Sequence, residues 1–152
     1  MTRKTTSNGQ KQPRRERWVK GNALAVAVHR ACKLSPEDRE LVVAPGRRAL
    51  AALREGRATH SEWTDLAAVV RIAQAIEKQG IVKGLQQQFD SAKTALQAIY
   101  DRAIRPDGWV PSALYAQELN AISEAVRLHK FQLDQLGRGE LIAALNATPK
   151  TL

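Results

Sequence analysis

Apolar residues recur along most of the chain at the three- and four-residue spacing of an α-helix. The pattern is dense between residues 60 and 79, where the stretch LAAVVRIAQAI is apolar on nearly every side. Such a stretch predicts a long central helix that is buried on most of its surface. Thr59 and Glu62 form a capping-box pattern at its start, and Gly80 stands where it should end.

The segment 112–136 has the most regular apolar spacing in the chain. One stripe alternates steps of four and three residues: Tyr115, Leu119, Ile122, Val126, His129, Leu133 and Leu136. A weaker stripe lies beside it: Leu114, Ala121, Ala125 and Leu128. This spacing predicts a long helix with a coiled-coil-like seam. The seam or the second stripe is therefore a candidate contact for a protein partner or for a second copy of the chain.

Shorter patterns predict the remaining helices, over about 23–32, 47–55, 84–104 and 139–147. Ser35-Pro36 starts a further helix, and whether it continues through Ala44 is open because Pro45 removes a hydrogen-bond donor. Pro106-Asp107-Gly108 is a turn sequence, and no alternating strand pattern or internal repeat is visible. We expect an all-α fold, an antiparallel bundle of three long helices with short N-terminal and C-terminal helices.

Composition agrees with a helical chain and bounds its environment. The 152 residues fit one domain, alanine and leucine dominate the apolar set, and aromatic residues make up only 5%. The one cysteine, Cys32, excludes an intramolecular disulfide and a multi-cysteine zinc site. No apolar run approaches the ~20 residues of a membrane helix, and no secretory signal precedes the body. We expect a cytoplasmic protein without membrane contact.

Positive charge is concentrated in the first twenty residues. This segment carries +6 of the formal net charge of +9, from seven cations and one acid, which leaves +3 for the rest. It has few apolar side chains, so we expect a disordered basic arm over residues 1–20, a helical domain over 21–148 and a polar tail over 149–152. The candidate nucleic-acid-binding residues of the arm are Arg3, Lys4, Lys11, Arg14, Arg15, Arg17, Trp18 and Lys20.

A second basic set follows Pro45 and is added to the candidate interface. Arg47 and Arg48 precede Arg54 and Arg57, and three of these four are spaced to share a helix face. The set either extends the footprint of the arm on DNA or RNA, or forms the solvated side of an amphipathic helix. Polybasic termini also serve solubility alone, so charge patterning by itself leaves both alternatives open.

Catalytic and metal-binding chemistry has little support in the sequence. His29 and Cys32 stand three apart on a predicted helix, but two ligands do not make a metal site. His129 interrupts the apolar seam, where a satisfied core histidine or a register device in a helix–helix contact is favoured over a catalytic base. Nucleotide-binding, calcium-binding and zinc-protease motifs are absent from the sequence. We expect no enzymatic activity, no cofactor and no metal.

Two stretches resemble a loose group of small uncharacterised proteins from prophages and plasmids of proteobacteria. They are ALAALREGRATHSEWTDLAAVVRIAQAI and EAVRLHKFQLDQL, within residues 46–136. The resemblance implies a mobile-element accessory role and assigns no residue a function. With the basic arm, it favours a regulatory or accessory protein that contacts nucleic acid. The alternative is a helical module that inhibits or bridges a host or phage protein without catalysis.

Overall fold

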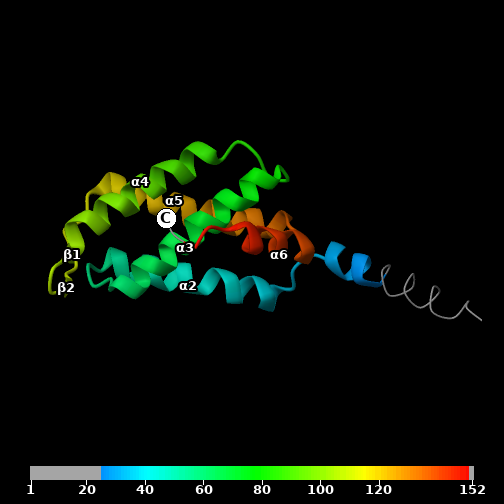
Figure 1. Ribbon diagram of the computed structural model, residues 1–152, viewed down its shortest axis with the longest axis horizontal. Helices are drawn as coiled ribbons and strands as arrows, with labels where there is room; N and C mark the ends of the chain where they lie inside the picture. Colours follow the sequence, from blue (N-terminus) through cyan, green and yellow to red (C-terminus); the bar gives the residue numbers. More distant parts are fainter. Residues whose placement is uncertain (1–24, 151–152) are drawn as a thin grey trace, which may run out of the picture.

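The computed structural model describes residues 25–150, and these form an almost entirely helical bundle (Figure 1). A short helix covers residues 25–31. The labelled elements follow in this order: α2 (Pro36–Arg54), α3 (His60–Gln79), α4 (Gln86–Ala103), β1 (Ile104–Arg105), β2 (Gly108–Trp109), α5 (Ala116–Gln135) and α6 (Arg138–Ala147). The prediction of an all-α fold is therefore confirmed.

Helix α2 corrects the expectation of two short helices in this region. It starts where predicted, because the Ser35 hydroxyl accepts a hydrogen bond from the Asp38 backbone N–H at 3.0 Å. It then runs through Pro45 without a break, so the described part of the chain has four long helices, not three. Gly46 lies against α3 here: an added Cβ would stand 2.6 Å from Cγ2 of Val69. Tertiary packing outweighs the helix-breaking tendency of this Pro-Gly pair.

Helix α3 confirms the predicted bounds and the predicted end signals. The Glu62 carboxylate accepts hydrogen bonds from the Thr59 backbone N–H at 2.6 Å and from the Thr59 hydroxyl at 3.0 Å. At the other end, Gly80 takes a positive φ of 79°, which glycine adopts without strain. The helix runs through the middle of the bundle and packs on α2, α4, α5 and α6.

The connection between α4 and α5 differs from the sequence prediction in two ways. The Pro106-Asp107-Gly108 turn closes a small antiparallel hairpin, in which Ile104 pairs with Trp109, and no strand was expected there. Helix α5 begins at Ala116 and not at 112, and residues 110–115 before it are non-helical. Tyr115, expected at the head of the buried seam, is instead 62% exposed.

Two apolar clusters fill the bundle. The larger lies among α2, α3, α4 and α5 and includes Phe89, Leu96 and Ile122; the smaller joins the start of α2 to the ends of α3 and α5 and to α6. Leu133 and Leu136 belong to the smaller cluster, and Ala125 and Leu128 to the larger. Both stripes of α5 are thus core over most of their length, which corrects the expectation that they form a contact for another chain.

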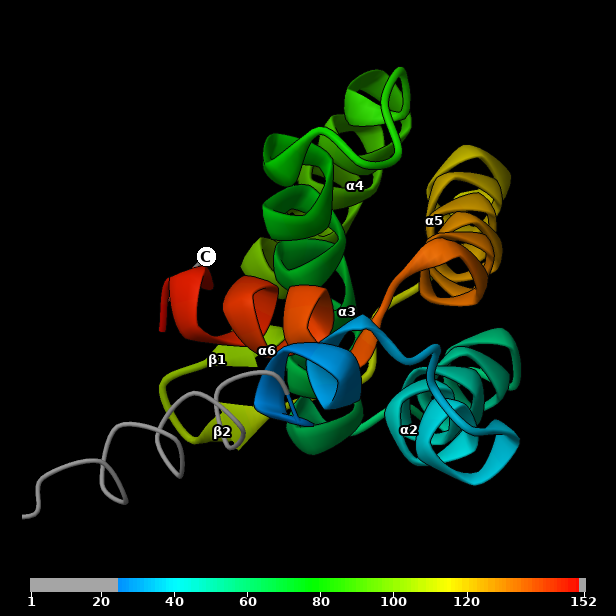
Figure 2. The ribbon, with the colours of Figure 1, turned by 90° about the vertical axis from the view of Figure 1, so that its right-hand side faces the viewer.

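Helix α6 and residues 25–33 pack together at one end of the bundle (Figure 2). The Arg138 backbone N–H donates to the Cys32 carbonyl at 2.9 Å, and Lys33 forms an isolated bridge with Gly137. The Arg138 side chain pairs with Asp38 and lies 3.1 Å from His29 Nε2. Gly139 permits this close approach, since an added Cβ would stand 2.7 Å from Cβ of Arg30. The helix over residues 25–31 otherwise extends away from the bundle, with every residue exposed (Figure 1).

None of the helices in the part of the chain that the structure covers has both the length and the apolar character to cross a membrane.

Candidate nucleic-acid interface

Most of the predicted interface lies outside the described residues, because the candidate residues of the arm fall within 1–24. These are Arg3, Lys4, Lys11, Arg14, Arg15, Arg17, Trp18 and Lys20. The structure therefore places only Arg47 and Arg48 of the predicted set.

Arg47 and Arg48 both lie on the exposed side of α2, but they differ in their partners. Arg47 makes two hydrogen bonds to the carboxylate of Glu40, which lies seven residues earlier on the same helix. This contact lowers the pKa of Glu40 and raises that of Arg47. Arg48 has no ion-pair partner among residues 25–150 and lines a shallow groove with Glu37, Glu40 and Leu41. Of the two, Arg48 is the one whose charge remains available to a phosphate.

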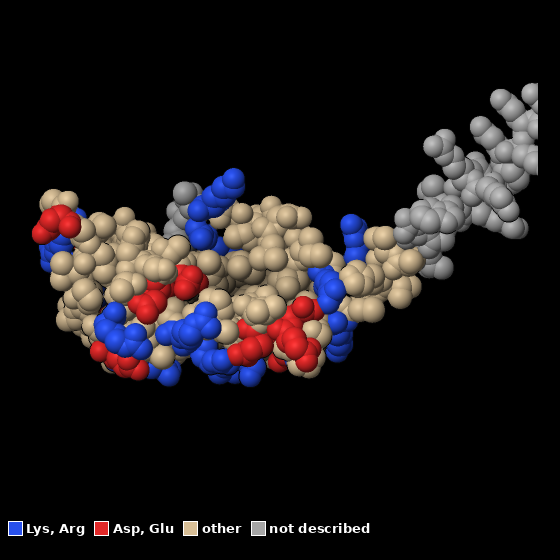
Figure 3. All heavy atoms as spheres, turned by 90° about the horizontal axis from the view of Figure 1, so that it is seen from below, with Lys and Arg blue, Asp and Glu red and all other residues tan. Residues whose placement is uncertain are grey.

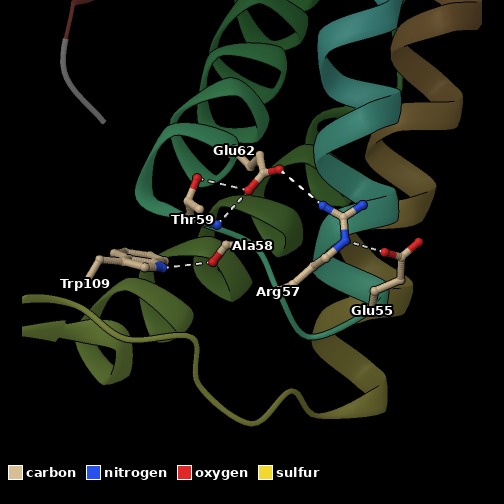
Figure 4. Close-up of polar contacts among 6 residues, drawn as sticks. All are labelled: Glu55, Arg57, Ala58, Thr59, Glu62 and Trp109. Carbon is tan, nitrogen blue, oxygen red and sulfur yellow. Dashed lines mark hydrogen bonds and ion pairs between the residues drawn. The ribbon is translucent and has the colours of Figure 1, made fainter.

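The neighbouring arginines are also engaged by polar groups of the protein. Arg54 donates to the Ser123 hydroxyl at 3.1 Å, across to α5. Arg57 pairs with Glu55, and its Nη1 lies 3.8 Å from Oε1 of Glu62 (Figure 4). The Glu55 carboxylate raises the pKa of Arg57. Because Arg57 lies beyond the end of α2, in the turn before α3, it does not extend the helical face that Arg47 and Arg54 share.

Charges of both signs are interspersed on this side of the molecule. In the view from below, Lys and Arg side chains alternate with Asp and Glu over the surface that includes α2 (Figure 3). Such a surface has no uniform positive field to attract a polyanion. The second basic set thus adds little to the footprint of the arm, with Arg48 as the exception.

A cluster of four aromatic rings, which the sequence analysis missed, occupies the end of the bundle next to Arg57. His60 and Trp63 of α3 meet Tyr100 of α4 and Trp109 of β2, and the six ring-to-ring centroid distances lie between 4.8 and 6.2 Å. Trp109 Nε1 donates to the Ala58 carbonyl at 2.9 Å (Figure 4), and Trp63 Nε1 donates to that of Leu96 at 2.9 Å.

Rings this close pack against one another and leave no space for a ligand between them. The cluster therefore holds the hairpin against α3 and α4. His60 is the exposed member of the cluster, Tyr100 and Trp109 are partly buried, and Trp63 is buried. No local sequence pattern connects these residues, because they come from three separate elements.

Cys32 and His29, the residues considered for metal binding, make local contacts within the protein. Cys32 is exposed and its thiol donates to the Val28 carbonyl at 3.2 Å, within its own helical turn, while His29 contacts Arg138. Across the described residues, no group of three or more His, Cys, Asp or Glu side chains is arranged to hold a metal ion. Glu62 acts as the helix cap expected of it.

His129 is buried in the core of the bundle with only 2% of its surface exposed. Neither ring nitrogen has a hydrogen-bond partner among the residues described, nor does Oε1 of the equally buried Gln132. The expectation of a core histidine is therefore confirmed, whereas the residues described do not satisfy its ring nitrogens. Burial disfavours the imidazolium and lowers the pKa of His129 to about 4. Gln132 Nε2 donates to the Ala73 carbonyl at 3.1 Å, and this hydrogen bond links α5 to α3.

No protein-family model, no curated protein and no solved structure matches this chain.

Proposed function

We propose that this protein is a mobile-element accessory protein that contacts DNA or RNA through its basic N-terminal segment, in a regulatory role without catalysis. The observation that carries the proposal is the distribution of charge. Residues 1–20 hold +6 of the net +9, whereas on the body six arginines pair with carboxylates: Arg39, Arg47, Arg57, Arg102, Arg127 and Arg138.

The physical basis is release of counterions from a phosphate backbone. Lysines and arginines on a segment without fixed structure, as the sequence predicts here, can follow phosphates of any geometry. Arg17 and Trp18 stand together, and an indole next to a guanidinium can stack on an exposed base. Arg48 would add one contact from the body, because no carboxylate within the described residues forms an ion pair with it.

A gel-shift titration with matched charge changes tests this proposal. One variant carries Arg14→Gln, Arg15→Gln and Arg17→Gln; the control carries Lys83→Gln, Arg105→Gln and Lys130→Gln, three cations without ion pairs in residues 25–150. Both lose three charges. We expect the arm variant to bind a duplex or single strand at least about tenfold more weakly than the control.

Salt dependence gives a second measurement in the same assay. For duplex DNA the log–log slope of affinity against salt should approach about −0.9 per phosphate neutralised, and the arm variant should have the shallower slope. Equal affinities for the two variants, or no binding by the unmodified protein at low salt, would contradict the proposal.

A second candidate function, a helical module that inhibits or bridges another protein, is favoured by one observation. Val26 and Val28 are 44% and 58% exposed on the helix that extends from the bundle, although apolar side chains normally gain by burial. This surface replaces the α5 seam, which is core. Light scattering coupled to size-exclusion chromatography tests this candidate, with Val26→Asp and Val28→Asp as variants. If the protein still forms the same complex with both substitutions, this surface is not the contact.

A further inference from the structure

A cavity of about 270 Å³ lies between α3, α4 and the segment that follows α6. One stripe of α3 forms its floor: Arg71, Gln74, Ala75, Lys78 and Gln79. Lys93 of α4 forms one wall, and Ala147 with Pro149 forms the other. Helix α6 packs on α3 and lies across it in Figure 2.

The charge in this cavity is of one sign. Arg71, Lys78 and Lys93 all line it, and its lining includes no carboxylate. None of the three cations has an acidic group within 4.0 Å among residues 25–150. The nearby Asp90 accepts hydrogen bonds from Gln74 and Gln86 and lines a separate groove with Gln86 and Gln87. A concave surface lined by one sign of charge focuses the field and concentrates counter-ions.

The Arg71 guanidinium is held in place but is not saturated. Its Nη1 donates to the Lys150 carbonyl at 2.9 Å, which fixes the side chain under the C-terminal segment. Its Nε atom is buried and has no hydrogen-bond partner within the described structure. A buried donor without an acceptor is costly, so the described structure leaves the Arg71 guanidinium with unused hydrogen-bonding capacity beside the cavity that this residue lines.

We propose that this cavity is a binding site for a phosphate group in its monoester form. Three cations suit a dianion better than a singly charged carboxylate, and a guanidinium matches phosphate oxygens with a directional pair of donors. The volume lies just below that of pockets for drug-sized ligands, which fits a phosphate with little attached. The group comes either from a free phosphate or mononucleotide or from the phosphorylated end of a nucleic acid strand.

The site does not include residues 1–20, so it goes beyond the function proposed above and stands or fails separately. Its test uses the full chain, with inorganic phosphate, adenosine monophosphate, and a short single-stranded oligonucleotide with and without a 5′-phosphate, all at constant ionic strength. The readout is ¹H–¹⁵N NMR of the side-chain amides of Gln74 and Gln79, which line the cavity.

The test variant is the double substitution Arg71→Gln and Lys93→Gln, and the matched control is Arg105→Gln with Lys130→Gln, two exposed cations outside the cavity. We expect saturable shifts of the Gln74 and Gln79 amide signals with phosphate, and at least about tenfold weaker binding in the test variant, as loss of charge-assisted hydrogen bonds implies. The control should change by less than about twofold, because it removes only distant charge.

Two outcomes would overturn the site: no saturable shift at the two glutamines, or equal weakening in both double variants. Shifts with free phosphate and adenosine monophosphate indicate a small-molecule site, whereas shifts with the 5′-phosphorylated strand alone indicate a nucleic acid end. The variant Arg14→Gln, Arg15→Gln, Arg17→Gln should leave phosphate binding unchanged, which separates this inference from the role of the arm.

Discussion

At the hairpin end of the bundle, formed by the end of α2, the start of α3, the end of α4 and β1–β2, Arg57 and Arg102 are paired with carboxylates and four aromatic rings are packed together. At the α6 end, formed by the end of α3, the start of α4, α6 and residues 25–33, three cations surround a cavity without a carboxylate in its lining. The larger apolar cluster includes the hairpin end and continues to Phe89 at the start of α4, whereas the smaller cluster lies at the α6 end. The comparison indicates that the hairpin end is built for stability and that the α6 end retains unsatisfied binding capacity.

The largest expected effect compares large-to-small substitutions at the two ends. Trp63→Ala removes a buried ring and the hydrogen bond to Leu96, and we expect it to lower the free energy of unfolding by about 3–5 kcal/mol. Leu141→Ala, in the smaller cluster, should cost about 2–3 kcal/mol. Urea unfolding with linear extrapolation measures both. An equal or greater loss for Leu141→Ala would break the comparison.

The next effect concerns His129, which lies on α5 between the residues of the two clusters. Its pKa in the folded protein, about 4, is below the 6.5 of an unperturbed imidazole. The unfolded chain therefore binds the proton first, so stability from the neutral ring is complete above about pH 6.5 and is lost as pH falls toward 4. The loss should reach about 3 kcal/mol.

His129→Gln provides the control, since it removes the titrating group. The folded protein also loses stability in acid when carboxylates with a lowered pKa, such as Glu118, are protonated. The difference between the two pH profiles of urea unfolding isolates the histidine. Parallel profiles between pH 6.5 and 4 would show that His129 protonates without cost.

A smaller effect is expected for the best-buried ion pair of the hairpin end. Arg102 donates to both oxygens of Glu118, at 2.8 and 2.6 Å, and its guanidinium lies 4.9 Å from the Tyr115 ring centroid. Arg102→Gln should cost about 1–2 kcal/mol, because Glu118 keeps only 12% side-chain exposure while solvent partly screens Arg102. Arg127→Gln, in the exposed pair with Glu124, should leave the urea midpoint unchanged.

The smallest effect is expected at the cavity. Arg71→Gln and Lys93→Gln break no ion pair within residues 25–150 and relieve repulsion between like charges. Each should leave Tm within about 2 °C of the unmodified value in low salt. A large loss measured by calorimetry would mean that these cations serve the fold, and the contrast between the two ends would disappear.

Local signals in the sequence predicted α3 well and failed at α2. Thr59, Glu62 and Gly80 act within one turn of their own positions, so the bounds of α3 follow from the chain alone. Pro45 is equally local, but α2 runs through it, and the neighbouring Gly46 packs closely against Val69 of another helix. Similarly, Tyr115 continues the apolar spacing of α5, yet the chain before Ala116 is extended in the connection from the hairpin.

The candidate sites show the same division. The concentration of charge in residues 1–20 and the candidate Arg48 can be read from the sequence, whereas the cavity cannot. Arg71 and Lys78 are seven residues apart on one stripe of α3, but Lys93 and Pro149 reach them only through folding. The same holds for Trp109, which meets His60 from the far side of the hairpin.

Spacing, capping and charge are properties of neighbouring residues, so the helical class, most helix ends and the separation of a strongly basic segment from a nearly neutral body follow from the sequence. Folding sets which cations are paired, leaves His129 and Gln132 buried without full partners, and brings Arg71, Lys78 and Lys93 to one cavity. Those properties depend on distances between helices, which the order of residues along the chain does not contain.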